Sequence, residues 1–151
     1  MNDEFQPSTE ERQRVAESVR EGMFAEDAAA QMLGMEVESI APGRARVGMT
    51  VRPDMLNGFG LCHGGLITTL ADTAFAYACN SHNELTLAAG IVMDLLAPVH
   101  EGERLTADAH EVAVKGRTGV YDVVVTNQDR KVVGVMRGRS FTQKGKTVVA
   151  L

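Results

Sequence analysis

Residues 57–80 read NGFGLCHGGLITTLADTAFAYACN, a glycine-rich polar loop that leads into an apolar helix. The helix expected from Gly65 to Cys79 carries leucine, isoleucine, alanine or phenylalanine on every side, so it cannot be a surface helix with one polar face. A single carboxylate, Asp72, interrupts its middle. Such a helix needs a layer of other elements around it, and the rest of the chain should supply that layer.

Segments with strand character stand on both sides of this helix. Before it, residues 35–39 and 45–51 alternate apolar and polar side chains around the turn Ala41-Pro42-Gly43. After it, four further strands are predicted at residues 85–96, 104–114, 118–126 and 131–142. Connections this short favour antiparallel neighbours, because a parallel pair needs a long crossover. The pattern therefore predicts an α+β fold in which a six-stranded antiparallel sheet wraps one long central helix.

The start of the chain is predicted to be helical and peripheral. Ser8 and Glu11 have the spacing of a capping box at a helix start. A second helical piece is expected from Glu26 to Leu33, and it ends at Gly34, a residue type that commonly terminates helices. This region should cover the fold rather than form its core.

The composition indicates one globular domain. The chain has 151 residues, 44% of them hydrophobic, and we divide it into an N-terminal helical extension (1–34) and the main fold (35–151). A net charge of −5 argues against nucleic acid as a partner. No secretory signal or membrane-spanning stretch is visible, and the two cysteines form no disulfide pattern, so a reducing cytoplasm is expected.

Two features of the central stretch are suited to chemistry. Gly64 and Gly65 leave backbone N–H groups free to bind an anion or an oxyanion, although glycines there also suit a tight turn. Asp72 lies ~12 Å further along the helix, too far for one reacting carbon to touch both groups. Two antiparallel copies, related by a twofold axis, would bring Gly64 of one chain towards Asp72 of the other. Alternatively, Asp72 only accepts hydrogen bonds from the hydroxyls of Thr68, Thr69 or Thr73, or caps a loop.

Three further residue patterns in the sequence could carry chemistry. Cys62 next to His63 suggests a cysteine nucleophile, but adjacent residues rarely face each other and no third group orients the pair. A metal site from His63, Asp72 and His82 lacks the usual ligand spacing, so no metal is expected. Basic residues gather in the late strands, either as a solvated strand face or as a rim that binds phosphate groups. They are Lys115, Arg117, Lys131, Arg137, Arg139, Lys144 and Lys146.

The motif His63-Gly64-Gly65, followed by LADTAFAYACN at residues 70–80, resembles the hotdog-fold acyl-CoA thioesterases. Within this family the chain most resembles the PaaI type of phenylacetic acid degradation. The resemblance covers roughly residues 34–142 and includes the segments 92–98, 116–122 and 138–140. It implies the hotdog fold and the hydrolysis of aryl- or phenylacetyl-type CoA thioesters.

The resemblance also implies a role for individual residues of the central stretch. The Gly64 N–H would polarise the thioester carbonyl, and Asp72 of the partner subunit would act as general base on water or as nucleophile. Asn57 and His63 would help to position the carbonyl or shape the loop. Thr73 would sit beside the base.

One position departs from the pattern of related thioesterases. They place a serine in the strand after the helix to hold the water, and the nearest position here is Ala88. Thr73 or another group would then hold the water instead.

The substrate and partners follow from the same resemblance. The phosphates and adenine of coenzyme A would lie near Lys115-Gly116-Arg117 and Arg137-Gly138-Arg139. Coenzyme A is part of the substrate, so no separate cofactor is expected. The active form would be a homodimer, assembled further into a tetramer of two dimers.

Two alternative functions remain at this stage. A non-catalytic acyl-CoA-binding hotdog protein would have no need of the carboxylate at Asp72. A hotdog dehydratase or hydratase would need a histidine and an acid together on the substrate, and the pattern of Gly64 with Asp72 fits hydrolysis better.

Overall fold

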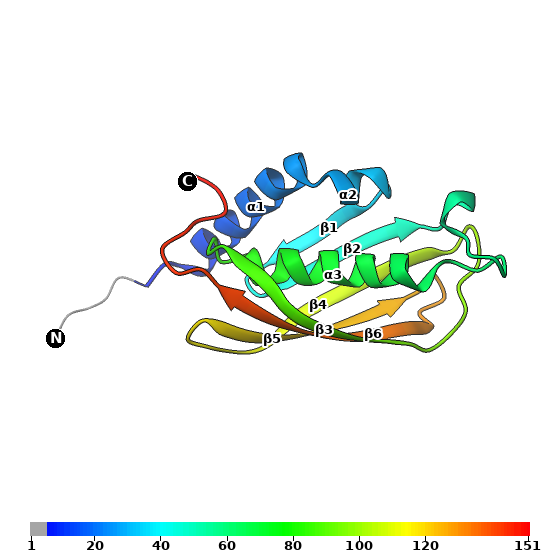
Figure 1. Cartoon of the computed structure of the whole chain (residues 1–151). Helices are drawn as coiled ribbons and strands as arrows, with labels where there is room; N and C mark the ends of the chain where they lie inside the picture. The colour runs from blue at the N-terminus through cyan, green and yellow to red at the C-terminus, as the bar shows by residue number, and fades with distance from the viewer. Residues whose placement is uncertain (1–5) are drawn as a thin grey trace.

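A single antiparallel sheet of six strands wraps the helix α3, Gly64–Asn80 (Figure 1). The computed structural model describes residues 6–151. The strands are β1 (Glu36–Ala41), β2 (Arg44–Thr50), β3 (Thr86–Leu95), β4 (Arg104–Lys115), β5 (Thr118–Thr126) and β6 (Val132–Thr142). They lie in the order β1-β2-β4-β5-β6-β3, and every neighbouring pair is antiparallel. The α+β architecture is confirmed, with the element limits within about two residues of those predicted.

Two helices precede the sheet, α1 (Thr9–Glu26) and α2 (Ala28–Met32). The capping box is confirmed, because the Ser8 hydroxyl accepts a hydrogen bond from the Glu11 N–H and the Glu11 carboxylate accepts one from the Ser8 N–H. The second helix does not begin at Glu26, as the sequence had suggested. Asp27 separates the helices, and its carboxylate caps α2 by accepting a hydrogen bond from the third residue of that helix.

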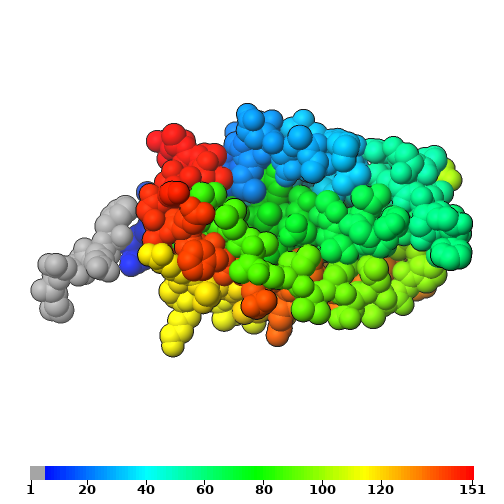
Figure 2. Space-filling view, viewed as in Figure 1, coloured from blue at the N-terminus to red at the C-terminus, as the bar shows by residue number. Residues whose placement is uncertain are grey.

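The sheet buries α3 on all sides but one. Ala71, Ala74 and Phe75 are completely buried against the strands. A stripe of the helix remains partly exposed, and it consists of Gly65, Leu66, Thr68, Thr69, Asp72, Thr73 and Ala76. Part of α3 lies open at the surface in Figure 2, beside the blue helices of the N-terminal region. The expectation that one chain buries the whole helix is wrong for this stripe, because the sheet ends at β3.

Strand β3 forms one edge of the sheet and is strongly apolar. Large hydrophobic side chains along β3 and just beyond it are 41–65% exposed, namely Leu87, Ile91, Val92, Leu95 and Leu96. Natural edge strands usually carry charges or other features that prevent pairing with a further strand. This edge therefore has the character of a surface that another chain covers. Within residues 6–151, no helix combines the length and the apolar character needed to cross a membrane.

Gly138 of β6 allows the sheet to pack directly on the central helix. A Cβ atom at this position would lie 2.8–2.9 Å from atoms of the Phe75 ring. We expect Gly138→Ala to lower the free energy of unfolding by about 1–3 kcal/mol, because the core cannot take the extra atom without moving the ring. Urea unfolding measures this effect. Gly58→Ala is the control, since nothing lies within 4 Å of a Cβ there, and equal stability of the two variants would contradict the packing argument.

Candidate active site

Helix α3 begins with one backbone N–H group, that of Gly64, that the described fold does not use. His63 is the N-cap residue, and its Nδ1 accepts a hydrogen bond from the Gly65 N–H at 3.3 Å. Within residues 6–151, the Gly64 N–H has no hydrogen-bond acceptor. A Cβ at position 64 would lie 2.5 Å from Leu95 Cδ1, so β3 packs against the helix start. Glycine at this position lets Leu95 pack closely on the helix start, and its N–H is free to bind a polarised oxygen.

The loop before α3 is held in shape by Asn57. Its side-chain oxygen accepts hydrogen bonds from the N–H groups of Phe59 (2.9 Å) and Leu61 (3.1 Å), and its own N–H donates to the Leu61 carbonyl at 2.7 Å. The His63 N–H donates to the carbonyl of Met55 at 2.8 Å. These contacts fix the direction in which the chain enters α3.

Asp72 lies half-buried on the open stripe of α3. The neighbouring hydroxyls do not bind its carboxylate, because each donates to a helix carbonyl four residues earlier at 2.7–2.8 Å. These hydroxyls belong to Thr68, Thr69 and Thr73. The alternative in which Asp72 only accepts hydrogen bonds from them is therefore wrong. Thr73 stands beside Asp72 in the chain, with its hydroxyl oxygen still able to accept a hydrogen bond.

A cavity of about 310 Å³ opens beside Asp72, between α3 and β3. Its lining is mostly apolar, with Phe75 and Ala76 from the helix and Ala88 from the strand. Asp72 and Ala88 thus line the same cavity. Ala88 is the position at which related thioesterases were expected to carry a serine. A carboxylate that lines an apolar cavity and has no hydrogen-bond partner among residues 6–151 is a typical arrangement for a catalytic base.

The walls of this cavity are fixed by Asn80 at the end of α3. Its amide nitrogen donates to the Thr86 carbonyl and its oxygen accepts from the Thr86 N–H, both at 2.9 Å. The Thr86 hydroxyl in turn lies 3.0 Å from that of Thr142 on β6. This buried polar set joins the end of α3 to the start of β3, the two elements that line the cavity.

Burial raises the pKa of Asp72 above its ordinary value, so the folded protein holds this proton more tightly than the unfolded chain. The corresponding stability is fully present below the unfolded-state pKa of about 3.9 and is lost as the pH rises through the higher folded-state pKa. We expect Asp72→Asn, which stays neutral, to be more stable than the native protein at ~pH 7, with a smaller difference at ~pH 3. Urea unfolding at both pH values measures the difference. A difference that grows towards acid pH would contradict this assignment.

The first of the two predicted basic segments forms an exposed turn. Lys115-Gly116-Arg117 connects β4 to β5, and Gly116 adopts a positive φ of 63°. Arg139 of β6 is also exposed, and the strand register pairs it with Val120 on β5, close to the same turn. Three basic side chains are therefore gathered at one end of the sheet.

The other two residues of the second segment are occupied by the fold. The guanidinium of Arg137 donates two hydrogen bonds to the carboxylate of Asp122, from Nε at 2.7 Å and from Nη2 at 2.8 Å. Gly138 is buried against Phe75. Neither lies free beside the Lys115–Arg117 turn.

The cysteine alternative fails on electrostatic grounds. Cys62 and Cys79 are both free and buried. Burial raises the pKa of both thiols, that of Cys79 to about 12, so neither is a thiolate near neutral pH. Among residues 6–151, no group of three or more His, Cys, Asp or Glu side chains is arranged to hold a metal ion.

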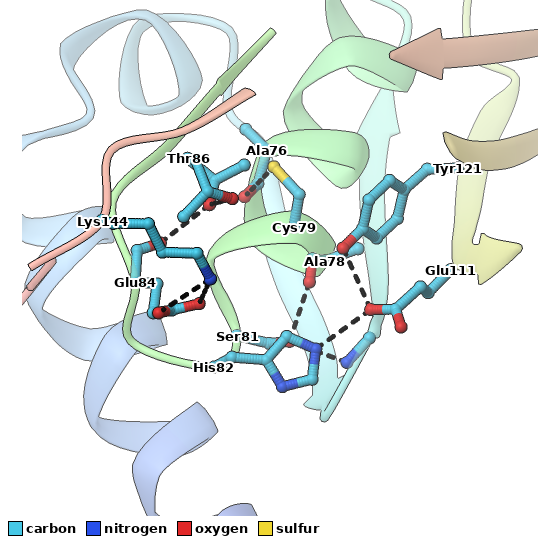
Figure 3. A network of polar contacts seen from close by, with 12 residues as sticks. Ala76, Ala78, Cys79, Ser81, His82, Glu84, Thr86, Glu111, Tyr121 and Lys144 are labelled. Carbon is cyan, nitrogen blue, oxygen red and sulfur yellow. Dashed lines mark hydrogen bonds and ion pairs between the residues drawn. The ribbon is translucent and has the colours of Figure 1, made fainter. Parts of the chain in front are cut away.

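His82 is engaged in a separate network at the C-terminal end of α3 (Figure 3). Its Nε2 lies 3.0 Å from the carboxylate of Glu111, and the same carboxylate accepts a hydrogen bond from the Tyr121 hydroxyl at 3.0 Å. Burial, together with this carboxylate, raises the pKa of Tyr121. On the other side of the helix end, Lys144 Nζ lies 3.4 Å from Glu84. These contacts close the end of the helix away from Gly64.

Sequence reasoning missed three residues around the site. Leu95 packs on the helix start, and Met23 of α1 and Val148 of the C-terminal segment line the cavity beside Asp72. No spacing in the sequence relates Met23 to Val148. Only Leu95 could have been suspected from the sequence. It lies in a strand whose apolar residues do not alternate with polar ones, which indicates that both faces of the strand are covered.

Comparisons with known proteins agree with this arrangement. Residues 59–134 match the family model described as the thioesterase superfamily. The chain is 46% identical over 118 residues to the acyl-coenzyme A thioesterase PaaI of Escherichia coli, which covers 78% of this chain and 84% of the relative. The solved structure of the E. coli PaaI protein from the phenylacetic acid degradation operon superposes with a TM-score of 0.87 at 42% identity, covering 89% of this chain and 97% of that one.

A further solved structure carries a ligand. A Streptococcus mutans protein bound to acetyl-CoA is 26% identical and has a TM-score of 0.72, covering 75% of this chain and 91% of that chain. The family model spans the stretch from His63 to Asp72, and the identity to the E. coli relative extends along most of both chains. The chain therefore belongs to the hotdog-fold thioesterase superfamily and is a thioester hydrolase.

Proposed function

We propose that this protein hydrolyses acyl-CoA thioesters of the aryl or phenylacetyl type, as part of phenylacetate breakdown. The observation that carries the proposal is the carboxylate of Asp72, which lines an apolar cavity and has no hydrogen-bond partner in the described part of the chain. The relative from E. coli is an acyl-coenzyme A thioesterase, and the S. mutans protein binds acetyl-CoA. An aromatic acyl group suits a small apolar cavity that has one polar group at its wall.

The proposed site is shared between two copies of the chain. Strand β3 runs from Thr86, beside the cavity, to Leu95, beside Gly64. Antiparallel pairing of two β3 edges about their midpoints would set Leu95 of one copy opposite Thr86 of the other. This pairing would bring the Gly64 N–H of one copy to the Asp72 cavity of the other, and it would cover both the exposed edge and the open stripe of α3.

The geometry supports a simple division of roles. The free N–H of Gly64 would bind the thioester oxygen and stabilise the negative charge that develops on it. Asp72 of the other copy would take a proton from water as the water oxygen bonds to the carbonyl carbon. The carbon–sulfur bond then breaks, the proton held by Asp72 passes to the departing sulfur, and coenzyme A leaves as the thiol with the carboxylic acid as the other product. Direct attack by Asp72, followed by hydrolysis of the anhydride, uses the same two groups.

We assign the phosphates of coenzyme A to the basic turn. Within one chain it lies at the end of the sheet away from Gly64 (Figure 1), so in an antiparallel dimer it would approach the Gly64 end of the other copy. Lys115, Arg117 and Arg139 are the residues we propose for this contact, with Gly116 allowing the turn. Arg137 and Gly138 would act indirectly, by keeping β6 in place.

The remaining features of the proposed function concern the setting of the enzyme. We expect no cofactor besides the coenzyme A of the substrate. The two free thiols fit a cytoplasmic location. Pairing of two such dimers would give the expected homotetramer.

The decisive experiment is a panel of acyl-CoA substrates. We expect release of free thiol from phenylacetyl-, hydroxyphenylacetyl- and benzoyl-CoA, with higher kcat/KM than from medium-chain acyl-CoA. Enoyl-CoA is included, since hydration of its double bond without thiol release would indicate a hotdog hydratase. Binding of acyl-CoA without turnover of any member would instead indicate a non-catalytic binding protein.

Substitution at the edge strand tests whether the dimer is needed. Val92 is 65% exposed and lies next to the midpoint of β3, so the proposed pairing would bury it opposite Ala89 of the other copy, where a charged side chain would lose its hydration. We expect Val92→Glu to shift the protein towards the monomer in sedimentation velocity, with turnover falling in parallel. Met32→Glu places the same charge at an exposed position on α2 and serves as the control. Full activity in a monomeric Val92→Glu variant would contradict the shared site.

A further inference from the structure

The cavity beside Asp72 has a wall that comes from outside the region matched by the family model. Met23 of α1 and Val148 of the C-terminal segment both line it. These residues are 125 positions apart in the sequence and lie outside residues 59–134. Neither side chain can transfer a proton or donate a hydrogen bond, so any effect on the reaction must come through the shape of the cavity.

The C-terminal segment is held in place by a specific clamp. Asn83 is buried and has a positive φ of 60°. Its side-chain oxygen accepts hydrogen bonds from the N–H groups of Val148 (3.0 Å) and Val149 (2.9 Å), and its amide nitrogen donates to the Val149 carbonyl at 3.1 Å. A cavity wall on a segment fixed by three hydrogen bonds is rigid enough to discriminate between ligands.

The same segment is locked to α1 on its other side. Val149 packs on Gly22 so closely that a Cβ at position 22 would collide with it. Met23 is the next residue of α1, and it is partly buried against the core while lining the cavity. Figure 2 shows the C-terminal segment, in red, lying directly against the blue N-terminal helix. The two segments therefore form one wall.

We propose that Met23 and Val148 determine acyl-group specificity, by closing the end of the cavity so that it admits a compact aryl or short acyl group and rejects longer chains. This inference rests on the proposed function, because it assigns the cavity beside Asp72 to the acyl group. The thioester would lie at Asp72, with the acyl group extending between Phe75 and Ala88 towards this wall. Asn83 is a positioning residue that holds Val148 in place.

The experiment compares kcat/KM for acetyl-, phenylacetyl- and decanoyl-CoA in wall variants of the full chain. Val148→Ala and Met23→Ala each enlarge the cavity from a different segment. We expect each to raise the ratio of decanoyl- to phenylacetyl-CoA hydrolysis by about tenfold, as is usual when a hydrophobic pocket gains room for further methylene groups. Val148→Phe should do the reverse, lowering phenylacetyl-CoA hydrolysis while leaving that of acetyl-CoA within a fewfold of native.

Met32→Ala is the matched control, because this methionine is exposed on α2 and does not line the cavity. Its substrate ratios should equal those of the native protein. Unchanged ratios in both alanine variants, with turnover intact and native thermal unfolding, would overturn the assignment of the wall. If the native protein hydrolysed none of the three thioesters, the proposed function itself would fail, so the two failures are distinguishable.

Discussion

Replacing Asp72 with asparagine is expected to lower kcat by about 10²–10⁴-fold, the usual contribution of a positioned general base. Asparagine has nearly the same shape but cannot accept a proton from water, and the carboxylate makes no hydrogen bond on which the described fold depends. The variant should therefore keep its fold and its oligomeric state. Thiol release from phenylacetyl-CoA measures the loss, and sedimentation velocity measures the assembly.

Asp129→Asn, in the exposed turn before β6, removes the same charge away from the site and should retain native turnover. Turnover of Asp72→Asn close to that of the control would rule out both the general-base and the nucleophile mechanism. A nucleophile and a general base are distinguished by single-turnover hydrolysis in ¹⁸O-labelled water, because only an anhydride intermediate places the label in Asp72 before the product.

A pair of substitutions at Gly64 is expected to isolate the contribution of a single N–H. Proline at this position removes the N–H, and the first residue of a helix tolerates proline well. His63 already has extended backbone angles, φ −60° and ψ 129°, which suit a residue that precedes proline. We expect Gly64→Pro to lower kcat by about 10²–10³-fold, the effect of losing one oxyanion donor.

Gly64→Ala is the matched control, since it keeps the N–H and adds the same Cβ next to Leu95. Its loss of turnover should be much smaller, because only the end of a flexible leucine side chain has to move. Equal losses in the two variants would mean that packing against Leu95 matters and the N–H does not. Comparison of kcat and KM for phenylacetyl-CoA makes the distinction.

Much of the fold was predictable because the relevant signals are local. The apolar character of residues 65–79 required a wrapped helix, and short connections required antiparallel strands. The exact break between α1 and α2 was not predictable from helical periodicity, since it depends on whether Asp27 caps a helix or continues one. The open stripe on α3 was also missed. Composition shows that the helix is apolar, but it does not show whether its own chain or another chain covers each side.

The site was predictable only in part, for a similar reason. Gly64 and Asp72 carry a recognisable chemistry and spacing, and the structure leaves both with unused polar groups. The engagement of Arg137 by Asp122 depends on strand register, which short motifs do not encode. The cavity wall formed by Met23 and Val148 depends on how the two end segments pack together, and nothing in the sequence near either residue indicates it.

The contact between Gly64 and Leu95 joins two distant positions into one evolutionary unit. A residue larger than alanine at position 64 would need a smaller one at 95, and a smaller residue at 95 alters the exposed edge of the sheet. Residues that touch in this way tend to covary among descendants of a common ancestor. Drift at the sheet edge is therefore restrained by the helix start, and the two positions should change together or remain as they are.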